Sequence, residues 1–158
     1  MAIKYDPEIG HEIIRDFNAR PEMLVQILHG FLARYRCVPP EAVPQIAEEL
    51  NLSRADVHGV VSYYHDFCDT PPGDTVIRIC QAESCQAMGS RALTAHASRK
   101  LDVALGETTA DGKITLAPVY CLGNCACSPA IMVEERVYGR VDNDRFDTLV
   151  DAARSNTQ

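Results

Sequence analysis

The sequence predicts an α+β chain in two parts, a helical bundle followed by a small α/β domain. Apolar residues recur at helical spacing in the first 70 residues, whereas residues 74–80 and 113–119 alternate in the manner of strands. Between these parts, Asp69-Thr70-Pro71-Pro72-Gly73 contains two prolines and a glycine, which interrupt a helix. We therefore predict a helical domain over residues 1–70 and a second domain over residues 74–158.

The helical part begins with a predicted helix around residues 9–17. A second helix is expected from Pro21, because apolar residues then follow at spacings of three and one up to Tyr35. Pro39-Pro40 ends this helix, and Pro40 is expected to open a shorter helix with an apolar face that reaches Leu50.

A further helix is predicted after Ser53, which is a good N-cap residue. Its inward face would hold Val57, Val60, Val61 and Tyr64. Tyr63 and Phe67 would then point elsewhere, at the end of the helix and just before the linker. Aromatic residues are enriched in interface cores, so we predict that this run docks a partner protein. The alternative is that both aromatic side chains cover the junction between the two domains.

The second part changes to a strand pattern. Residues 74–80 are predicted as a strand and residues 88–101 as a helix. Asp111-Gly112 is a strong hairpin turn, here expected between strands 106–110 and 113–119. A second strand pair, 131–135 and 137–141, precedes a last helix capped by Asp144. The expected order is β-α-β-β-α with one extra hairpin strand.

Composition limits the function classes that fit. The chain of 158 residues has a net charge of −7, which argues against a nucleic-acid or anionic-membrane partner held by general charge attraction. No apolar run approaches the length of a membrane span, and the first ten residues do not follow the pattern of a secretory signal. We therefore expect a cytoplasmic protein. Its seven cysteines should then be reduced, which favours metal ligation or redox chemistry over disulfides.

Four of the cysteines form two pairs that follow predicted strands. Cys80 and Cys85 are separated by four residues, and Cys121 and Cys125 by three. Four thiolates suit either zinc or an iron–sulfur cluster. The wider spacing favours a [2Fe–2S] cluster, and Gly123 would let the second loop turn so that backbone N–H groups approach the sulfurs. A zinc-stabilised interaction module is the rival interpretation.

The other cysteines have simpler interpretations. Cys37 and Cys68 are expected to be packing residues, because buried cysteine often acts as a small hydrophobe. Cys127 is an alternative to Cys125 as fourth ligand, although Cys125 is favoured. A thiol–disulfide enzyme would need a close dithiol, for which Cys125 and Cys127 are the only candidates. The sequence contains no phosphate-binding glycine loop and no nucleophile–base arrangement, so no catalytic residue is predicted.

These motifs resemble those of the thioredoxin-like [2Fe–2S] ferredoxin family, whose best-known member is the 24 kDa subunit of respiratory complex I. The resemblance rests on the two cysteine pairs with the Cys-Leu-Gly-x-Cys loop, on Pro129 shortly after it, and on the run from Ser53 to Tyr64. It covers nearly the whole chain. Within the family, residues 80–89 and 125–129 are most similar to the gamma subunit of NAD-dependent formate dehydrogenases.

The resemblance implies a thioredoxin-like second domain that carries one [2Fe–2S] cluster on Cys80, Cys85, Cys121 and Cys125. It also implies a flavoprotein partner subunit that holds FMN, a [4Fe–4S] cluster and the NAD site, and a further catalytic subunit of the complex. Such a chain would transfer electrons for an NAD-dependent formate dehydrogenase. The alternative is the equivalent subunit of NADH:quinone oxidoreductase or of a hydrogenase diaphorase module.

Overall fold

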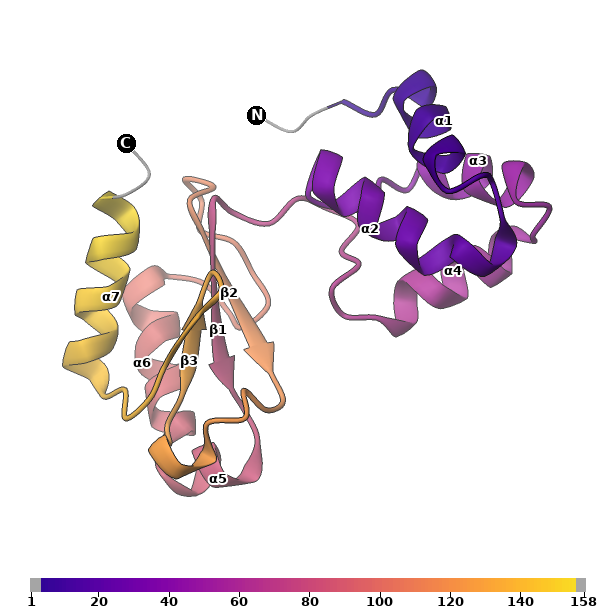
Figure 1. The fold of residues 1–158 in the computed structure, drawn as a ribbon. Helices are drawn as coiled ribbons and strands as arrows, with labels where there is room; N and C mark the ends of the chain where they lie inside the picture. Colours follow the sequence, from indigo (N-terminus) through magenta and orange to yellow (C-terminus); the bar gives the residue numbers. More distant parts are fainter. Residues whose placement is uncertain (1–3, 156–158) are drawn as a thin grey trace. The chain divides into compact units, whose positions relative to one another are not determined.

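The structure is a computed structural model that describes residues 4–155 (Figure 1). The chain divides into two compact units, residues 1–71 and 72–158, which we call the helical unit and the sheet unit. Within residues 4–155, no helix is both long and apolar enough to cross a membrane. The chain has the α+β composition that the sequence predicts.

Over residues 4–71, the helical unit contains four α-helices and one 3-10 turn. They are α1 (Pro7–Asp16), η1 (Pro21–Met23), α2 (Leu24–Tyr35), α3 (Ala42–Glu49) and α4 (Arg54–Tyr63). Two helices begin later than predicted. Pro21 opens the 3-10 turn rather than α2, and α3 begins at Ala42 rather than at Pro40. The reason at α3 is a turn in which the Ala42 N–H donates to the Pro39 carbonyl over 2.9 Å.

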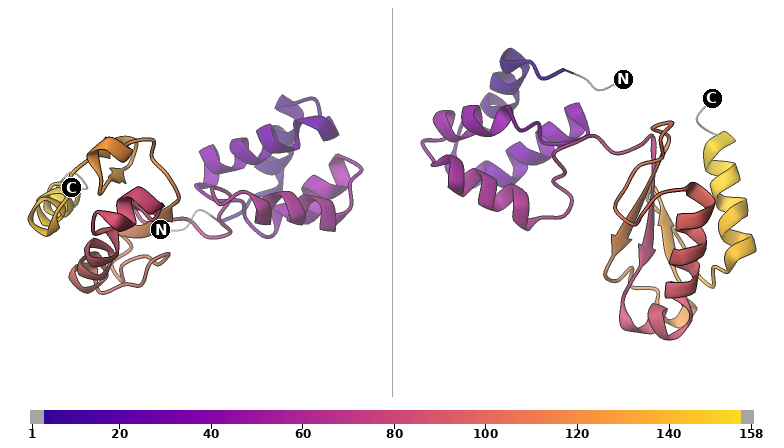
Figure 2. Two further views of the ribbon diagram at one scale, coloured as in Figure 1. Left: turned by 90° about the horizontal axis from the view of Figure 1, so that it is seen from below. Right: turned by 180° about the vertical axis from the view of Figure 1, so that it is seen from behind.

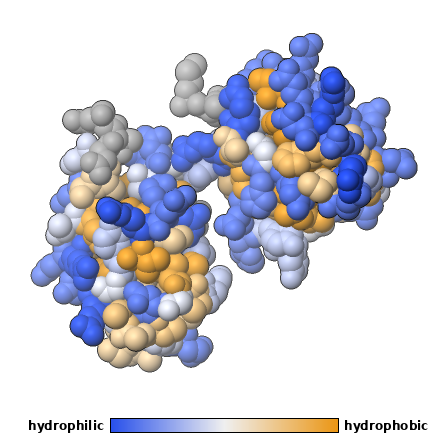
Figure 3. Space-filling view, in the orientation of Figure 1, coloured by the Kyte–Doolittle hydropathy of each residue, from blue (hydrophilic) through white to orange (hydrophobic). Residues whose placement is uncertain are grey.

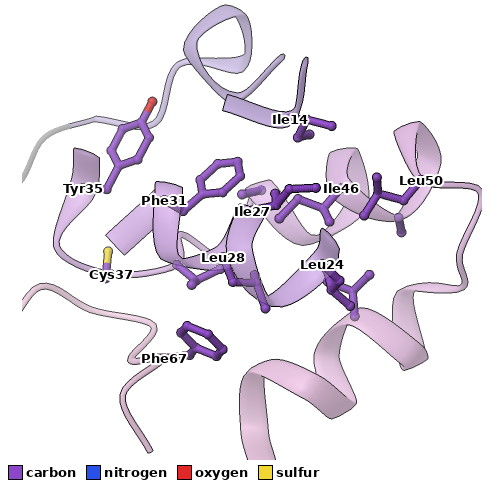
Figure 4. Close-up of a cluster of buried hydrophobic side chains, with 14 residues drawn as sticks. Ile14, Leu24, Ile27, Leu28, Phe31, Tyr35, Cys37, Ile46, Leu50 and Phe67 are labelled. Atoms are coloured by element: carbon purple, nitrogen blue, oxygen red, sulfur yellow. The ribbon is translucent and has the colours of Figure 1, made fainter. Parts of the chain in front are cut away.

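The core of the helical unit forms around α2. Ile27, Leu28, Phe31 and Tyr35 are buried on one face of this helix, as the apolar spacing predicts, and Figure 4 shows them among side chains from the other helices. A Cβ atom on Gly30 would lie 2.7 Å from Ile13, so the glycine permits close contact with α1.

The end of α4 differs from the prediction. A capping box between Ser53 and Asp56 begins the helix as expected. The helix ends at Tyr63, and the residues after it no longer follow its stripe. Tyr64 is 44% exposed rather than inward, whereas Phe67 is 6% exposed and belongs to the core. The exposed aromatic pair is therefore Tyr63 and Tyr64, not Tyr63 and Phe67.

The sheet unit has a four-stranded mixed sheet in the order β2-β1-β3-β4. β1 runs parallel to β2 and antiparallel to β3, and β3 and β4 form a hairpin. Two helices, α6 and α7, lie side by side on one face of this sheet (Figures 1 and 2). The bounds are β1 (Thr75–Cys80), α5 (Glu83–Ala87), α6 (Ser90–Leu101), β2 (Ile114–Val119), η2 (Cys125–Cys127), β3 (Ile131–Val133), β4 (Arg136–Tyr138) and α7 (Asn143–Ser155).

Burial alternates along most of β1, because only one face of the sheet carries helices. Ile77 and Ile79 of β1 and Leu116 of β2 are fully buried, and they pack with Leu93 of α6 and Phe146 of α7. This packing fixes the register of β1 against β2, because a slip by one residue would turn the apolar side chains to the other face. The carboxyl ends of these two parallel strands therefore lie at the same edge of the sheet.

Three details of the sheet unit correct the predictions. Residues 106–110 do not form a continuous strand; they pair with β2 through an isolated bridge between Thr108 and Thr115 and through backbone hydrogen bonds, such as that from the Gly106 N–H to the Leu116 carbonyl over 2.6 Å. The helix predicted over residues 88–101 begins at Ser90, because Gly89 has a positive φ and separates it from α5. The last helix is capped by Asp142 rather than Asp144, since the Asp142 carboxylate accepts the Arg145 N–H over 2.8 Å.

Candidate metal centre

Both cysteine pairs lie at the carboxyl edge of the parallel strands. Cys80 is the last residue of β1, and Cys85 lies on the short helix α5 that follows. Cys121 comes two residues after the end of β2, in the loop that leads to Cys125 on η2. In Figure 1, α5 and the loop that contains η2 lie at the same end of the sheet unit. A hydrogen bond of 2.7 Å from the Gln81 N–H to the Val119 carbonyl ties the two strand ends together.

The first pair is buried and close. Cys80 and Cys85 are each 2% exposed, pack with Ala130, and share a hydrogen bond between their thiols. Burial raises the pKa of Cys80. Burial would also raise the pKa of Cys85, but its hydrogen bonds with the Ser128 hydroxyl and the Ala130 N–H outweigh burial and hold that pKa below its ordinary value.

The second pair lies at the surface. Cys121 and Cys125 are both exposed. Gly123 has a φ of +71° and turns the loop between them, as the sequence predicts, and its N–H donates to the Cys121 sulfur over 3.3 Å. The hydrogen bond between the two thiols, together with the charge of Cys121, raises the pKa of Cys125. Cys85 also acts electrostatically on Cys125, so the two pairs are neighbours.

The four thiols fit a two-iron cluster. A [2Fe–2S] cluster takes four cysteine sulfurs, two on each iron, and the structure offers two pairs. Three of the four sulfurs have backbone N–H groups as hydrogen-bond partners, as expected around an anionic group. These N–H groups belong to Ala82, Leu122, Gly123 and Ala130. A zinc-stabilised module stays the rival interpretation, because zinc also takes four thiolates.

The remaining cysteines occupy other surroundings. Cys127 packs against Gly139 after β4, and its carbonyl accepts the Arg140 N–H over 2.6 Å. Cys37 is buried in the core of the helical unit, where burial raises its pKa to about 11. Burial also raises the pKa of Cys68, whose thiol donates to the Arg36 carbonyl. Cys37 and Cys68 thus belong to the helical unit, whereas the two pairs belong to the sheet unit.

Sequence reasoning missed a pair of serines at the site. Ser84 and Ser128 each directly adjoin a cysteine in the sequence, which was the available signal. Their hydroxyls lie 2.9 Å apart, and both donate to the Cys125 carbonyl, over 3.2 Å from Ser84 and 2.9 Å from Ser128. This network joins α5 to η2. The surface at this end of the sheet unit is mostly weakly apolar in colour (Figure 3).

A small mixed sheet with cysteine pairs beyond the ends of two parallel strands defines a thioredoxin-like protein that can bind metal through thiolates. The family model of the thioredoxin-like [2Fe-2S] ferredoxins matches residues 10–154. The chain belongs to this family, as its motifs predicted.

Relatives of this chain include subunits of NADH-quinone oxidoreductase and of an NADP-reducing hydrogenase. A NADH-quinone oxidoreductase component from Pseudomonas aeruginosa is 38% identical over 115 residues, which are 73% of this chain and 69% of that relative. The HndA subunit of the NADP-reducing hydrogenase of Solidesulfovibrio fructosivorans is 30% identical over 133 residues, or 82% of this chain and 78% of the relative.

A solved structure shares the fold. The crystal structure of an air-oxidized NAD+-reducing [NiFe]-hydrogenase matches 86% of this chain with a TM-score of 0.70 and 24% sequence identity. This chain spans only 23% of the hydrogenase chain, so the shared fold is one part of a much longer polypeptide there.

Proposed function

We propose that this chain is an electron-transfer subunit that carries one [2Fe–2S] cluster on Cys80, Cys85, Cys121 and Cys125. The observation that carries the proposal is the arrangement of these thiols as two adjacent pairs with backbone N–H donors on their sulfurs. The family to which the chain belongs is named for this cluster. When bound, such a cluster accepts and returns one electron at a time.

The two cysteine pairs have different roles in this proposal. Cys80 and Cys85 are buried against Ala130, where water is excluded, so they anchor the cluster to the sheet. Cys121 and Cys125 are exposed, so they form the side from which a partner exchanges electrons. Tyr120, beside Cys121, is also exposed and adds apolar area at this side.

We propose a flavoprotein subunit with FMN and an NAD site as that partner. Curated relatives are subunits of NADH-quinone oxidoreductase and of an NADP-reducing hydrogenase, which supports an assembly of this type. Within this class we propose an NAD-dependent formate dehydrogenase, because residues 80–89 and 125–129 resemble the corresponding segments of its gamma subunit. The quinone-linked and hydrogenase assemblies are the other outcomes of the test.

The cluster is tested by metal analysis of the anaerobically purified chain. We expect about two irons and two sulfides per chain and the red-brown absorption of a [2Fe–2S] species. Stoichiometric zinc without sulfide would reject the cluster and support the zinc-stabilised module.

The assembly is tested by purifying a tagged chain from its own cells with its partner subunits. The purified complex should reduce NAD with formate, whereas NADH should reduce the cluster of the isolated chain only after the flavoprotein is added. Reduction of NAD with hydrogen, or oxidation of NADH by a quinone, in place of the formate reaction would assign the chain to the other assemblies. Rapid reduction of the isolated chain by NADH would contradict the division of labour.

A further inference from the structure

The side chain of Ser128 is buried among the proposed cluster ligands. It is 7% exposed and lies just after η2. Its hydroxyl oxygen is 3.5 Å from the Cys85 sulfur, 2.9 Å from the Ser84 hydroxyl and 2.9 Å from the Cys125 carbonyl. A buried hydroxyl in this position contacts one ligand sulfur and the backbone of a second ligand.

We propose that Ser128 is a positioning residue that raises the reduction potential of the cluster by donating a hydrogen bond to the Cys85 sulfur. The inference rests on the proposed function, because it requires Cys85 to be a ligand. Hydrogen bonds to the sulfurs are among the factors that set the potential of iron–sulfur clusters. A donor stabilises the more negative, reduced state more than the oxidised state, and therefore raises the potential.

The protons in this network can be accounted for in both states. With a free thiol, the Cys85 S–H donates to the Ser128 oxygen, and the Ser128 O–H donates to the Cys125 carbonyl. When Cys85 is a ligand its thiol has lost its proton, so the Ser128 O–H must be the donor in the hydrogen bond between them. The Cys125 carbonyl keeps a donor, because the Ser84 hydroxyl lies 3.2 Å from it. Because Ser84 donates to this carbonyl, the Ser128 O–H is available to donate to the Cys85 sulfur.

Ser128 differs from the other donors at the site. The groups that lie on the sulfurs of Cys80 and Cys121 are backbone N–H groups, of Ala82, Leu122 and Gly123, and substitution leaves such groups in place. Within residues 4–155, Ser128 is the side chain other than a cysteine that hydrogen-bonds to one of these sulfurs. The residue at position 128 can therefore change the potential without a change of ligand.

The experiment is a redox titration of full-length protein with its cluster, followed by visible absorption and by the EPR signal of the reduced state. Ser128→Ala should move the midpoint potential to more negative values with cluster content unchanged, and Ser128→Thr, which retains the hydroxyl, should restore it. Ser90→Ala is the matched control. It also removes a buried hydroxyl beside a ligand, but that hydroxyl donates to the Cys80 carbonyl and not to a sulfur.

An unchanged potential in Ser128→Ala, or an equal shift in Ser90→Ala, would overturn the inference. If Ser128→Ala holds no cluster, Ser84→Ala decides. In Ser84→Ala, the Ser128 hydroxyl is the remaining side-chain donor to the Cys125 carbonyl, so it is less available to the Cys85 sulfur. The midpoint potential should then shift to more negative values by less than is expected of Ser128→Ala. An unchanged potential in Ser84→Ala would refute the role of Ser128. Absence of iron and sulfide from the unmodified chain would instead refute the proposed function.

Discussion

Gly139 lies directly against Cys127, so that a Cβ atom on the glycine would be 2.6 Å from the Cys127 Cβ. The same added atom would lie 2.7 Å from the Asn124 side chain and from the Cys127 carbonyl oxygen. The Arg140 N–H donates to that carbonyl. The segment after β4 is thus packed tightly on η2, and this contact holds Cys127 while Cys125 stays beside Cys121.

Gly139→Ala should destabilise the sheet unit. The added methyl group would overlap backbone as well as side-chain atoms of η2, and overpacking of this type costs about 1–3 kcal/mol. The free energy of unfolding in urea measures the effect. Gly59→Ala is the matched control, because a Cβ there meets nothing within 4 Å and the residue lies inside α4. That change should stabilise by about 0.5–1 kcal/mol, and equal destabilisation by both would contradict the tight packing at Gly139.

Removal of single thiols should separate ligands from packing cysteines. Alanine at position 80, 85, 121 or 125 is expected to abolish the visible spectrum and to destabilise the sheet unit, because the energy of metal binding also stabilises the fold. Cys127→Ala should retain the visible spectrum and the EPR signal of the reduced state, as should Cys37→Ala. If Cys127→Ala loses the cluster and Cys125→Ala retains it, then Cys127 is the fourth ligand and Cys125 is not.

The helix pair α6 and α7 should show a small dependence of stability on acid pH. The Asp147 carboxylate accepts a hydrogen bond from the His96 ring over 2.8 Å and lies 3.6 Å from the Lys100 ammonium group. The hydrogen bond, with the charge of Lys100, lowers the pKa of Asp147. The resulting stabilisation is therefore full above the pKa of the unfolded chain and is lost as pH falls through the lower pKa of the folded protein.

Asp147→Asn tests this relationship. Its free energy of unfolding should be lower than that of the unmodified chain by less than about 1 kcal/mol at pH 5, because the group is partly solvated. The difference should shrink as pH falls through the lowered pKa of the folded protein, because the carboxyl then becomes protonated in both states. Asp151→Asn, on the same helix, is the control and should show no comparable trend. A difference that grows on acidification would contradict the sign.

The sequence predicted the elements with regular patterns and missed those set by single contacts. The stripe along α2 and the alternation along β1 were sufficient, because burial on one face imposes them. The break between α5 and α6, in contrast, depends on the positive φ of Gly89, which the apolar pattern of the sequence does not reveal. The cysteine pairs were visible from their spacing. The contact of Ser128 with Cys85 was not, because it depends on how residues 43 positions apart are brought together.

The exposed pair Tyr63 and Tyr64 is expected to dock the flavoprotein. Tyr63 is 73% exposed, and its ring lies edge-on to that of Tyr64 with the centroids 5.1 Å apart. Tyr64 in turn contacts the buried Phe67, so the core supports the pair. Rigid aromatic side chains of this kind often carry much of the binding energy at an interface.

The double variant Tyr63→Ser with Tyr64→Ser should therefore weaken binding of the flavoprotein at least about tenfold, which is roughly 1.4 kcal/mol. Its cluster spectrum should be unchanged, because the sheet unit holds all four proposed ligands. Val137→Ser, an exposed apolar residue on β4, is the matched control and should bind normally. A chain that begins at Asp74 should likewise keep its spectrum and lose its partner. Full affinity in both the double variant and the shortened chain would mean that the helical unit contributes only stability, because the partner would then be held by the sheet unit alone.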